Sequence, residues 1–248
     1  GQHRLSGQAA RIDALQALTP RVMRVVLRPD RWVRPRPGQH LDVRLTAEDG
    51  YQAQRSYSLL SPPQRTGLYE LGIERLDDGE VSTWFHDKAQ HGETIEVLGP
   101  VGGHFVLDES NTRPALLIGG GSGVVPLLSM AAQRVGAYSQ AHTTLLVAAR
   151  HLDEVLLWPT LQRWEAFTPR FRSRLALSRD TCAPRAQDHV GRIDGADVAW
   201  ALQQLGDVAT ESAQVFICGR NDFVESIVHM VTGLNVPEVS IRTERFGS

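Results

Sequence analysis

A run of glycines between an apolar segment and a helical pattern constrains the fold of this chain more than any other feature. Residues 115–118 are apolar, residues 119–123 read G-G-G-S-G, and the periodicity of a helix begins after them. A strand, a tight turn and a helix N-terminus in this order can bind a pyrophosphate, because glycine lets backbone N–H groups approach the phosphates and the helix dipole favours negative charge. The common G-x-G-x-x-G pattern is incomplete, since Val124 occupies its third glycine position. The run therefore predicts a nucleotide-binding turn.

The chain that follows a polar stretch at residues 108–114 has the pattern of an α/β domain. Short apolar strands alternate with helical segments, which is typical of a parallel sheet covered on both faces. The predicted strands are residues 115–118, 143–149, 171–177 and 215–218, and the predicted helices are residues 125–135, 157–167, 197–204 and 222–234. Ligands on such sheets bind at the carboxyl ends of the strands.

A second motif lies at residues 54–63, which read Q-R-S-Y-S-L-L-S-P-P. Alternation along a strand places Arg55 and Tyr57 on one face and Ser56 and Ser58 on the other. A guanidinium pairs with phosphate oxygens, an aromatic ring stacks on a flavin ring, and a hydroxyl can hydrogen-bond the reactive nitrogen of a flavin. The motif therefore favours a flavin dinucleotide, and the alternative is a half-buried strand that binds nothing.

The first part of the chain has the pattern of an antiparallel barrel. Six short segments alternate in the manner of strands and are separated by proline and glycine turns, which suits a closed barrel. These segments are residues 9–15, 22–27, 39–45, the strand of the flavin motif, 68–75 and 94–98. A helix is expected from residues 79 to 89, with Ser82 as its cap.

The two motifs in this order resemble the ferredoxin–NADP reductase family of flavoproteins, which has an R-x-Y-S flavin motif and a later G-G-G-x-G-x-x-P nucleotide motif. Residues 99–105 add a G-P-x-G-x-F element with one extra residue, and Cys218 with the following glycine supplies a late C-G element. The resemblance covers nearly the whole chain. It implies a six-stranded antiparallel FAD-binding β-barrel in residues 1–110, followed by a parallel-sheet, Rossmann-like NAD(P)-binding domain in residues 111–248.

The resemblance also implies which residues hold FAD. Arg55 is expected to bind the pyrophosphate opposite a G-x-V-S element at the start of the predicted helix, and Tyr57 is expected to stack on the flavin ring. Phe246 would cover the flavin face that the nicotinamide must reach. The predicted FAD-binding residues are Arg55, Tyr57, Ser58, Leu59, Ile73, Arg75, Val81, Ser82, Thr83 and Phe246.

Three residues are expected to act at the transfer site itself. The resemblance puts Ser58 beside the reactive flavin nitrogen, Cys218 against the nicotinamide and Glu244 at the transfer site as a polar group. The family usually has proline after C-G, whereas this chain has Arg220. Glu244 matches the E-x-aromatic ending of the plant-type enzymes, although here two further residues follow the aromatic ring.

The predicted nucleotide site favours NADPH over NADH. An arginine after the second strand of such a sheet favours a ribose 2′-phosphate, whereas an acid there favours the free 2′-hydroxyl. Arg150 follows the second predicted strand, and Asp153 and Glu154 nearby weaken the preference. The predicted NAD(P)-binding residues are Gly120, Gly121, Ser122, Gly123, Arg150, Ser178, Arg179, Arg192, Cys218 and Gly219.

Composition limits the partners and cofactors. The net charge of −2 gives no reason to expect nucleic acid or an anionic membrane as a partner. Two cysteines cannot hold a plant-type [2Fe–2S] centre, which needs four thiolates, so an iron–sulfur partner would be a separate chain or lie outside this sequence. The nine histidines have no zinc-ligand spacing, so no metal is expected. The absence of a long apolar run predicts a cytoplasmic protein.

These patterns predict an FAD-dependent enzyme that passes electrons from NADPH through FAD to a separate acceptor, such as a ferredoxin. The cofactors carry the hydride and electron transfers, and the protein positions them. One alternative is the NADH-using reductase component of a multicomponent oxygenase or another oxidoreductase, and another is a non-catalytic flavin-binding module. Six arginines form a possible basic docking face for an acidic partner: Arg21, Arg24, Arg28, Arg31, Arg34 and Arg36.

Overall fold

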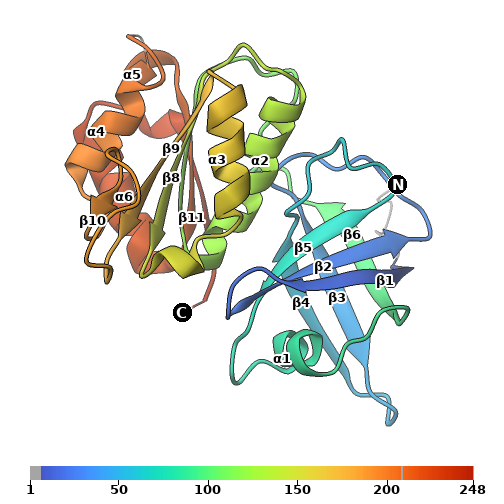
Figure 1. Cartoon of the computed structure of the whole chain (residues 1–248). Helices are drawn as coiled ribbons and strands as arrows, with labels where there is room; N and C mark the ends of the chain where they lie inside the picture. Colours follow the sequence, from blue (N-terminus) through green and yellow to red (C-terminus); the bar gives the residue numbers. More distant parts are fainter. Residues whose placement is uncertain (1–6, 208, 248) are drawn as a thin grey trace.

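The computed structural model describes residues 7–207 and 209–247 and contains two sheets, one in each half of the chain (Figure 1). The first sheet is antiparallel, with the strand order β4-β3-β6-β1-β2-β5. An isolated bridge between Leu59 and Leu71 joins its two edges, so the sheet curls into a barrel. Its strands are β1 (Gln8–Ala17), β2 (Val22–Pro29), β3 (His40–Thr46), β4 (Gln52–Ser58), β5 (Tyr69–Glu74) and β6 (Thr94–Val101). The predicted antiparallel six-stranded barrel is confirmed.

Alternation of side chains fills the barrel. In β3, Leu41 and Val43 are fully buried, whereas Asp42 between them faces outward. The helix α1 (Glu80–Asp87) covers one end of the barrel and buries Phe85 there. The predicted cap of this helix is wrong, because the N-cap residue has no side-chain hydrogen bond and the Ser82 hydroxyl is buried against the preceding loop. The side chain of Ser82 accepts from the Leu76 N–H at 3.0 Å, so it fixes the turn that leads into the helix.

The second sheet is parallel throughout, with the strand order β10-β9-β8-β7-β11-β12. Its strands are β7 (Ala115–Gly120), β8 (Thr143–Ala149), β9 (Phe171–Leu177), β10 (His189–Val190), β11 (Gln214–Gly219) and β12 (Ile241–Arg245). The predicted Rossmann-like parallel sheet is confirmed, and all four strands expected from the sequence are present. The two edge strands β10 and β12 were not predicted.

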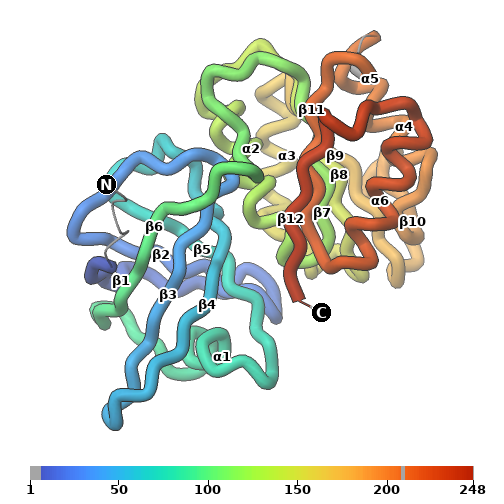
Figure 2. The backbone as a smooth tube through the Cα atoms, turned by 180° about the vertical axis from the view of Figure 1, so that it is seen from behind, coloured from blue at the N-terminus to red at the C-terminus, as the bar shows by residue number. Residues whose placement is uncertain are grey.

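Helices cover both faces of this sheet (Figure 1, Figure 2). The helices α2 (Val124–Gly136) and α3 (Trp158–Phe167) pack in one apolar layer, and α4 (Gly195–Gln203) and α6 (Asn221–Gly233) pack in the other. The shorter helical segments are η1 (Gly121–Gly123), η2 (Leu152–Glu154), α5 (Ala209–Ser212) and η3 (Glu238–Ser240). No helix of the described residues is long and apolar enough to cross a membrane.

The barrel and the parallel sheet share one hydrophobic cluster. Phe105 and Leu107, which follow the last barrel strand, lie in the same buried cluster as Leu128 and Phe216 of the α/β half. The Phe105 and Phe216 rings meet edge to face, with centroids 5.4 Å apart. The loop after β4 also binds α2, since the Ser129 hydroxyl donates to a loop carbonyl at 2.8 Å. The two halves are therefore held together by an apolar seam as well as by the chain.

Candidate functional site

The flavin motif forms an edge strand of the barrel, with its faces arranged as the sequence predicts. Tyr57 pairs with Leu41, and Arg55 pairs with Val43, so both side chains stand on the inner face of the sheet beside fully buried residues. Ser56 stands on the other face, where its hydroxyl donates to the Asp42 carboxylate. The strand therefore presents an arginine and an aromatic ring on one side.

The two side chains have properties that suit a flavin dinucleotide. Arg55 is exposed, and its guanidinium donates to the carbonyl of Gln54 at 2.7 Å, which leaves other N–H groups of the fork able to receive phosphate oxygens. The Tyr57 ring is half-buried and lies edge-on to Phe85 at a centroid distance of 6.4 Å. Burial raises the pKa of Tyr57 to about 12, so the side chain stays a neutral phenol at physiological pH. Arg55 can thus bind an anion, and the Tyr57 ring beside it can support an aromatic group.

Several other predicted FAD-binding residues face the interior of the barrel. Leu59, Ile73 and Val81 are buried in its core, so contact with a cofactor would have to come from their backbone. The first N–H groups of α1, including that of Val81, have no acceptor within the helix, as at any helix N-terminus. Thr83 is already engaged through its hydroxyl, which donates to the carbonyl of Gly79 at 2.7 Å.

Arg75 and Ser58 have different surroundings. Arg75 lies just past β5 and forms ion pairs with Asp87 at 2.6 Å and Asp77 at 3.4 Å. These two acids hold the guanidinium at the loop before α1 and at the helix end. Ser58 ends β4 in a partly buried position opposite His40. Of the FAD set, the structure thus brings Arg55, Tyr57 and Ser58 onto one strand.

The glycine run forms the turn that the sequence predicts, between β7 and α2. Gly121 has a φ of +58°, a left-handed conformation that glycine adopts without strain, and nothing lies within 4 Å of the position of a Cβ there. Gly123 packs against β11, where an added Cβ would lie 2.4 Å from the carbonyl oxygen of Cys218. One side of the turn is therefore open to a ligand and the other is pressed against the neighbouring strand, as a phosphate cradle requires.

A carboxylate from the barrel reaches this turn. The Ser122 hydroxyl donates to Glu74 at 2.9 Å, and Glu74 is the last residue of β5. Beside this contact Gly72 packs on Val125 at the start of α2, since a Cβ at Gly72 would lie 2.7 Å from the valine side chain. The end of β5 and the glycine turn are thus in direct contact across the seam between the two halves of the chain.

The predicted Cys218 and Glu244 lie side by side on neighbouring strands. Cys218 of β11 pairs in register with Glu244 of β12, and the thiol donates to the carboxylate over an Sγ–Oε2 distance of 3.8 Å. Burial raises the pKa of the Cys218 thiol well above its ordinary value, and the Glu244 carboxylate adds to this effect. Burial also raises the pKa of Glu244, although the hydrogen bond from the thiol opposes it. The thiol is therefore neutral at physiological pH.

The C-terminal segment brings Phe246 to the same place. Its N–H donates to the carbonyl of Gly219 at 3.2 Å, so the chain continues along β11 beyond the paired strands. The ring is partly buried and packs on the hydrophobic cluster that joins the two halves, which includes Cys218. Phe246, Cys218 and Glu244 therefore form one group at the carboxyl end of β11.

The difference between the two cysteines gives a direct chemical prediction. Cys182 is exposed and Cys218 is buried, with a thiol that burial keeps protonated. We expect iodoacetamide at pH 8 to label the native protein once, at Cys182, and the urea-unfolded protein twice, as read by intact mass. The Cys182→Ser variant should take up no label in the native state. Labelling of Cys218 in native protein would show that its strand end opens to solvent.

Of the three arginines predicted to bind the ribose 2′-phosphate, two lie on loops that are bonded to each other. Arg150 follows β8 and Arg179 follows β9, and a backbone hydrogen bond of 2.9 Å from the Arg179 N–H to the Arg150 carbonyl holds the two loops together. Arg192 lies just beyond β10, and β10 pairs with β9. All three side chains are exposed. Arg150, however, forms an ion pair with Glu154 at 3.0 Å, so one carboxylate stands within the predicted phosphate site.

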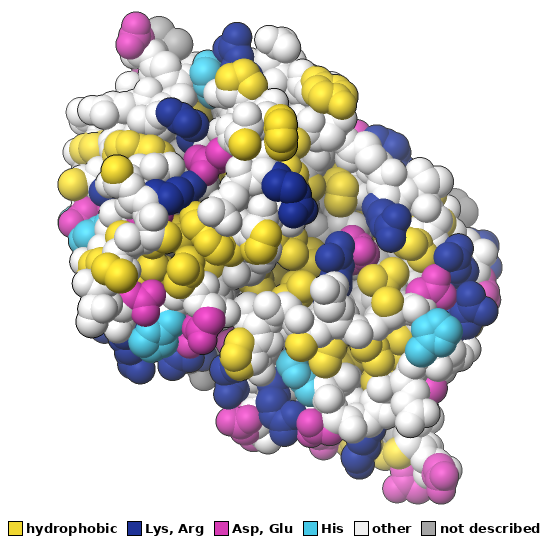
Figure 3. All heavy atoms as spheres, in the orientation of Figure 1, with side chains coloured by type: hydrophobic (Ala, Val, Ile, Leu, Met, Phe, Trp, Pro, Cys, Tyr) yellow, Lys and Arg dark blue, Asp and Glu magenta, His cyan; other side chains and the backbone are white. Residues whose placement is uncertain are grey.

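The six arginines of the predicted docking face are mostly paired with acids from other parts of the chain. The pairs are Arg21 with Asp77, Arg24 with Glu70, Arg28 with Asp13, Arg34 with Glu109 and Arg36 with Asp108. Dark blue and magenta side chains alternate over the barrel half on the face drawn in Figure 3. The sequence suggests a block of positive charge because these acids are distant along the chain. In the fold they offset most of it.

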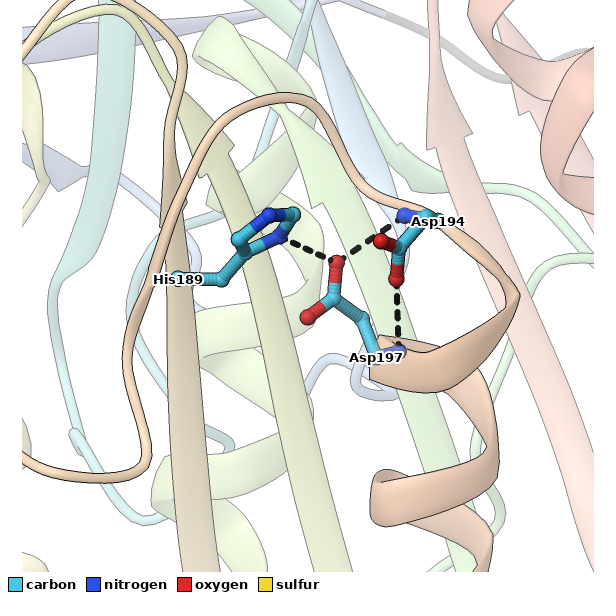
Figure 4. Close-up of side chains that lie close together, drawn as sticks. All are labelled: His189, Asp194 and Asp197. Carbon is cyan, nitrogen blue, oxygen red and sulfur yellow. Dashed lines mark hydrogen bonds and ion pairs between the residues drawn. The ribbon is translucent and has the colours of Figure 1, made fainter.

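A cluster of His189, Asp194 and Asp197 near Arg192 has ligand atoms within 4.8 Å of one another (Figure 4). These atoms already have partners. Asp194 and Asp197 form a capping box at the start of α4, and Asp197 also accepts from His189 at 2.9 Å and from Arg174 at 2.8 Å. The Arg174 guanidinium pairs with the buried Asp197 carboxylate and offsets its negative charge. The cluster anchors the loop between β10 and α4.

Comparison with known proteins identifies both halves of the chain. Residues 18–106 match the family model of the oxidoreductase FAD-binding domain, and residues 117–229 match that of the oxidoreductase NAD-binding domain. A ferredoxin–NADP reductase B of Sorangium cellulosum is 29% identical over 199 residues, which are 79% of this chain and 80% of that protein.

A second relative is longer than this chain. The ferredoxin reductase component of 3-ketosteroid-9-alpha-monooxygenase from Mycobacterium tuberculosis is 31% identical over 220 residues, which are 89% of this chain and 57% of that protein. The chain therefore spans little more than half of this relative.

The fold agrees with these matches. The FAD/NAD-binding domain of a nitric oxide dioxygenase from Vibrio cholerae superposes with a TM-score of 0.85 at 21% identity, over 98% of this chain and 99% of that one. The chain is thus a flavoprotein reductase with FAD and NAD(P)H as cofactors. It belongs to the ferredoxin–NADP reductase-like family of flavoprotein oxidoreductases.

Proposed function

We propose that the protein takes electrons from NADPH and passes them through FAD to a separate acceptor protein, such as a ferredoxin or an oxygenase component. The observation that carries this proposal is the contact between Ser122 of the glycine turn and Glu74 at the end of a barrel strand. A nucleotide on the turn would meet a flavin held by the barrel at this seam. When bound, FAD supplies the conversion of a two-electron donor into one-electron steps.

In this proposal the barrel holds FAD and residues beyond position 110 hold the nucleotide. Arg55 binds the pyrophosphate together with the free N–H groups at the start of α1, and Tyr57 supports the flavin ring. The Ser58 hydroxyl hydrogen-bonds the ring edge. Cys218 and Glu244 contact the nicotinamide, because their strand end lies next to the glycine turn. The Cys218 thiol donates to the Glu244 carboxylate at this strand end, and a polar pair beside the glycine turn supports an active enzyme over a non-catalytic flavin-binding module.

The acceptor is proposed from the relatives and not from a charged surface of this chain. Two relatives are named for ferredoxin reduction, one of them as a component of a monooxygenase. Five of the six arginines of the docking face are paired with acids, and Arg31 is the one for which the described residues provide no ion pair. Long-range attraction of an acidic partner to this face is therefore small, and short-range fit would decide the docking.

One observation favours the alternative with NADH as donor. The ion pair between Glu154 and Arg150 sets a carboxylate where a 2′-phosphate would bind. A carboxylate at this position can instead accept a hydrogen bond from the ribose hydroxyl of NADH. We retain NADPH because Arg179 and Arg192 add two exposed guanidinium groups at the neighbouring strand ends.

A visible spectrum followed by anaerobic titration tests the proposal. We expect a yellow protein whose flavin absorbance bleaches faster with NADPH than with an equal concentration of NADH. Faster bleaching with NADH would move the protein to the alternative and leave the reductase activity in place. Protein that takes up no added FAD would contradict the flavin site.

Removing two of the arginines tests the nucleotide preference. Changing Arg150 and Arg179 together to alanine should raise the KM for NADPH about 30-fold and the KM for NADH less than 3-fold, because both side chains are exposed and an exposed ion pair to the phosphate contributes up to about 1 kcal/mol. Steady-state reduction of ferricyanide measures both constants. Changing Arg172, an exposed arginine within β9, is the control. Equal effects on the two nucleotides would contradict a 2′-phosphate site.

A further inference from the structure

A carboxylate from the barrel lies at the glycine turn and has no basic side chain paired with it. Glu74 ends β5 in a partly buried position and accepts from the Ser122 hydroxyl at 2.9 Å. Among the residues that the structure describes, Glu74 forms no ion pair, and the next residue, Arg75, pairs with other acids. The negative charge of Glu74 is therefore not offset by an ion pair.

The turn that Glu74 contacts attracts negative charge. The helix α2 begins directly after the turn and has 13 residues, so its dipole favours an anion at this end. The N-cap residues of the turn and of the helix, Gly120 and Gly123, make no side-chain cap, and the first N–H groups of a helix have no acceptor within it. Glu74 thus brings an anion next to the place where the pyrophosphate of a nucleotide is expected to bind.

A pyrophosphate on the turn would compete with the Glu74 carboxylate for the same hydroxyl. A serine hydroxyl has one hydrogen to donate, and Ser122 donates it to Glu74. A phosphate oxygen that accepted this hydrogen would leave the partly buried carboxylate without its bond to Ser122. The two anions would also repel each other, because unit charges a few ångströms apart interact even in water. Both effects weaken the binding of a nucleotide.

We propose that Glu74 is a positioning residue that lowers the affinity of the glycine turn for NAD(P), through its bond to Ser122 and through its charge. The inference rests on the proposed binding of the nucleotide at this turn. Because NADH and NADPH share the pyrophosphate, Glu74 weakens both alike and leaves the preference between them to the arginines that follow β8 and β9. By weakening the hold on the oxidised nucleotide, Glu74 favours its release after the flavin is reduced.

Replacing Glu74 with glutamine tests this inference. Glutamine keeps the size of the side chain and an oxygen that accepts from Ser122, but it removes the charge. We expect NADP⁺ and NAD⁺ each to bind about 5-fold more tightly to the FAD-loaded Glu74→Gln protein, from the repulsion of unit charges about 4 Å apart in water. Isothermal titration calorimetry of the oxidised protein measures both dissociation constants without turnover.

Two further variants make the test specific. Glu48→Gln removes the same charge from an exposed position in the hairpin between β3 and β4, at the end of the barrel away from the parallel sheet, and should leave both affinities unchanged (Figure 1). Glu74→Met removes the charge and the acceptor together, so Ser122 can donate to a phosphate, and its gain in affinity should be at least as large as that of Glu74→Gln. If Glu74 only held the two halves of the chain together, neither Glu74 variant would bind the nucleotides more tightly.

Ionic strength distinguishes an effect of charge from an effect of side-chain shape. The Debye length is about 3 Å at 1 M salt, so the ratio of the dissociation constants of the original and Glu74→Gln proteins should fall toward 1 there. An unchanged or lower affinity of Glu74→Gln, a gain limited to one nucleotide, or a gain that is the same at low and high salt would overturn the role of Glu74 while the nucleotide site itself stands. An original protein that binds neither NADP⁺ nor NAD⁺ would instead reject the glycine turn as the nucleotide site. Near-ultraviolet circular dichroism of each variant verifies that it is folded.

Discussion

Replacing Arg55 with alanine is expected to lower the affinity of the apoprotein for FAD about 100-fold. A charged hydrogen-bonding group contributes roughly 1.5–3 kcal/mol, and a guanidinium that grips a pyrophosphate with two N–H groups lies at the upper end, near two decades of affinity. Within residues 7–207 and 209–247, the exposed Arg55 side chain hydrogen-bonds only to a backbone carbonyl, so its loss leaves no buried acid unpaired. The loss should therefore appear in cofactor binding and not in folding.

Flavin fluorescence titration measures this change, and two variants serve as controls. Arg55→Lys keeps the charge but loses the planar fork, so its affinity for FAD should fall between the other two proteins. Arg31→Ala removes another exposed arginine of the barrel and should leave FAD binding unchanged. If Arg55→Ala protein purified with a full complement of FAD and an unchanged dissociation constant, the pyrophosphate would have to bind elsewhere.

Substituting Gly123 with alanine should destabilise the protein by about 3 kcal/mol, since a rigid overpacked contact costs of that order. The new Cβ would meet the Cys218 carbonyl oxygen at 2.4 Å and the Gly219 Cα at 3.0 Å, and both are backbone atoms of a central strand. Either the glycine turn or the end of β11 must move. We expect a Tm lower by about 6–12 °C, from 2–4 °C per kcal/mol for a chain of this size. Nucleotide binding should weaken with it.

Whether Gly123→Ala lowers or raises the stability distinguishes a steric clash from an effect of helix propensity. Gly123 has a φ of −61°, which is helical, so propensity alone predicts that alanine would stabilise the turn. Gly233 at the end of α6 is the matched control, because nothing lies within 4 Å of the position of its Cβ. Gly233→Ala should leave Tm unchanged or raise it slightly. A Gly123→Ala protein as stable as its parent would mean that the turn does not press on β11.

Local signals in the sequence were enough for the two sheets and for the turn between β7 and α2. Alternation predicted the faces of β4 correctly, because Arg55 and Tyr57 are neighbours on one strand and need no distant residue to orient them. The edge strands were missed for different reasons. The strand β10 has only two residues, and β12 reads I-R-T-E-R, which lacks the apolar run of a buried parallel strand.

Contacts between segments that are distant along the chain could not be predicted from the sequence. Ser122 was expected to serve only the nucleotide, but it also binds Glu74, which no motif marks. Ser82 was expected to cap a helix, but the loop before the helix captures its hydroxyl instead. The charge of the arginine-rich segment was overestimated because acids more than forty positions away, such as Glu70 and Glu109, pair with it in the fold. These pairs form only in the folded protein, so the spacing of residues along the chain does not predict them.

The apolar seam between the barrel and the parallel sheet couples the binding of the two cofactors through the stability of the protein. Because Phe105 and Leu107 belong to the same buried cluster as Leu128 and Phe216, neither half can melt without exposing part of the cluster that both halves share. Heating should therefore give a single calorimetric transition. A dinucleotide bound at the strand ends would then raise the temperature at which the flavin is released, since any ligand of the native state stabilises the whole cooperative unit.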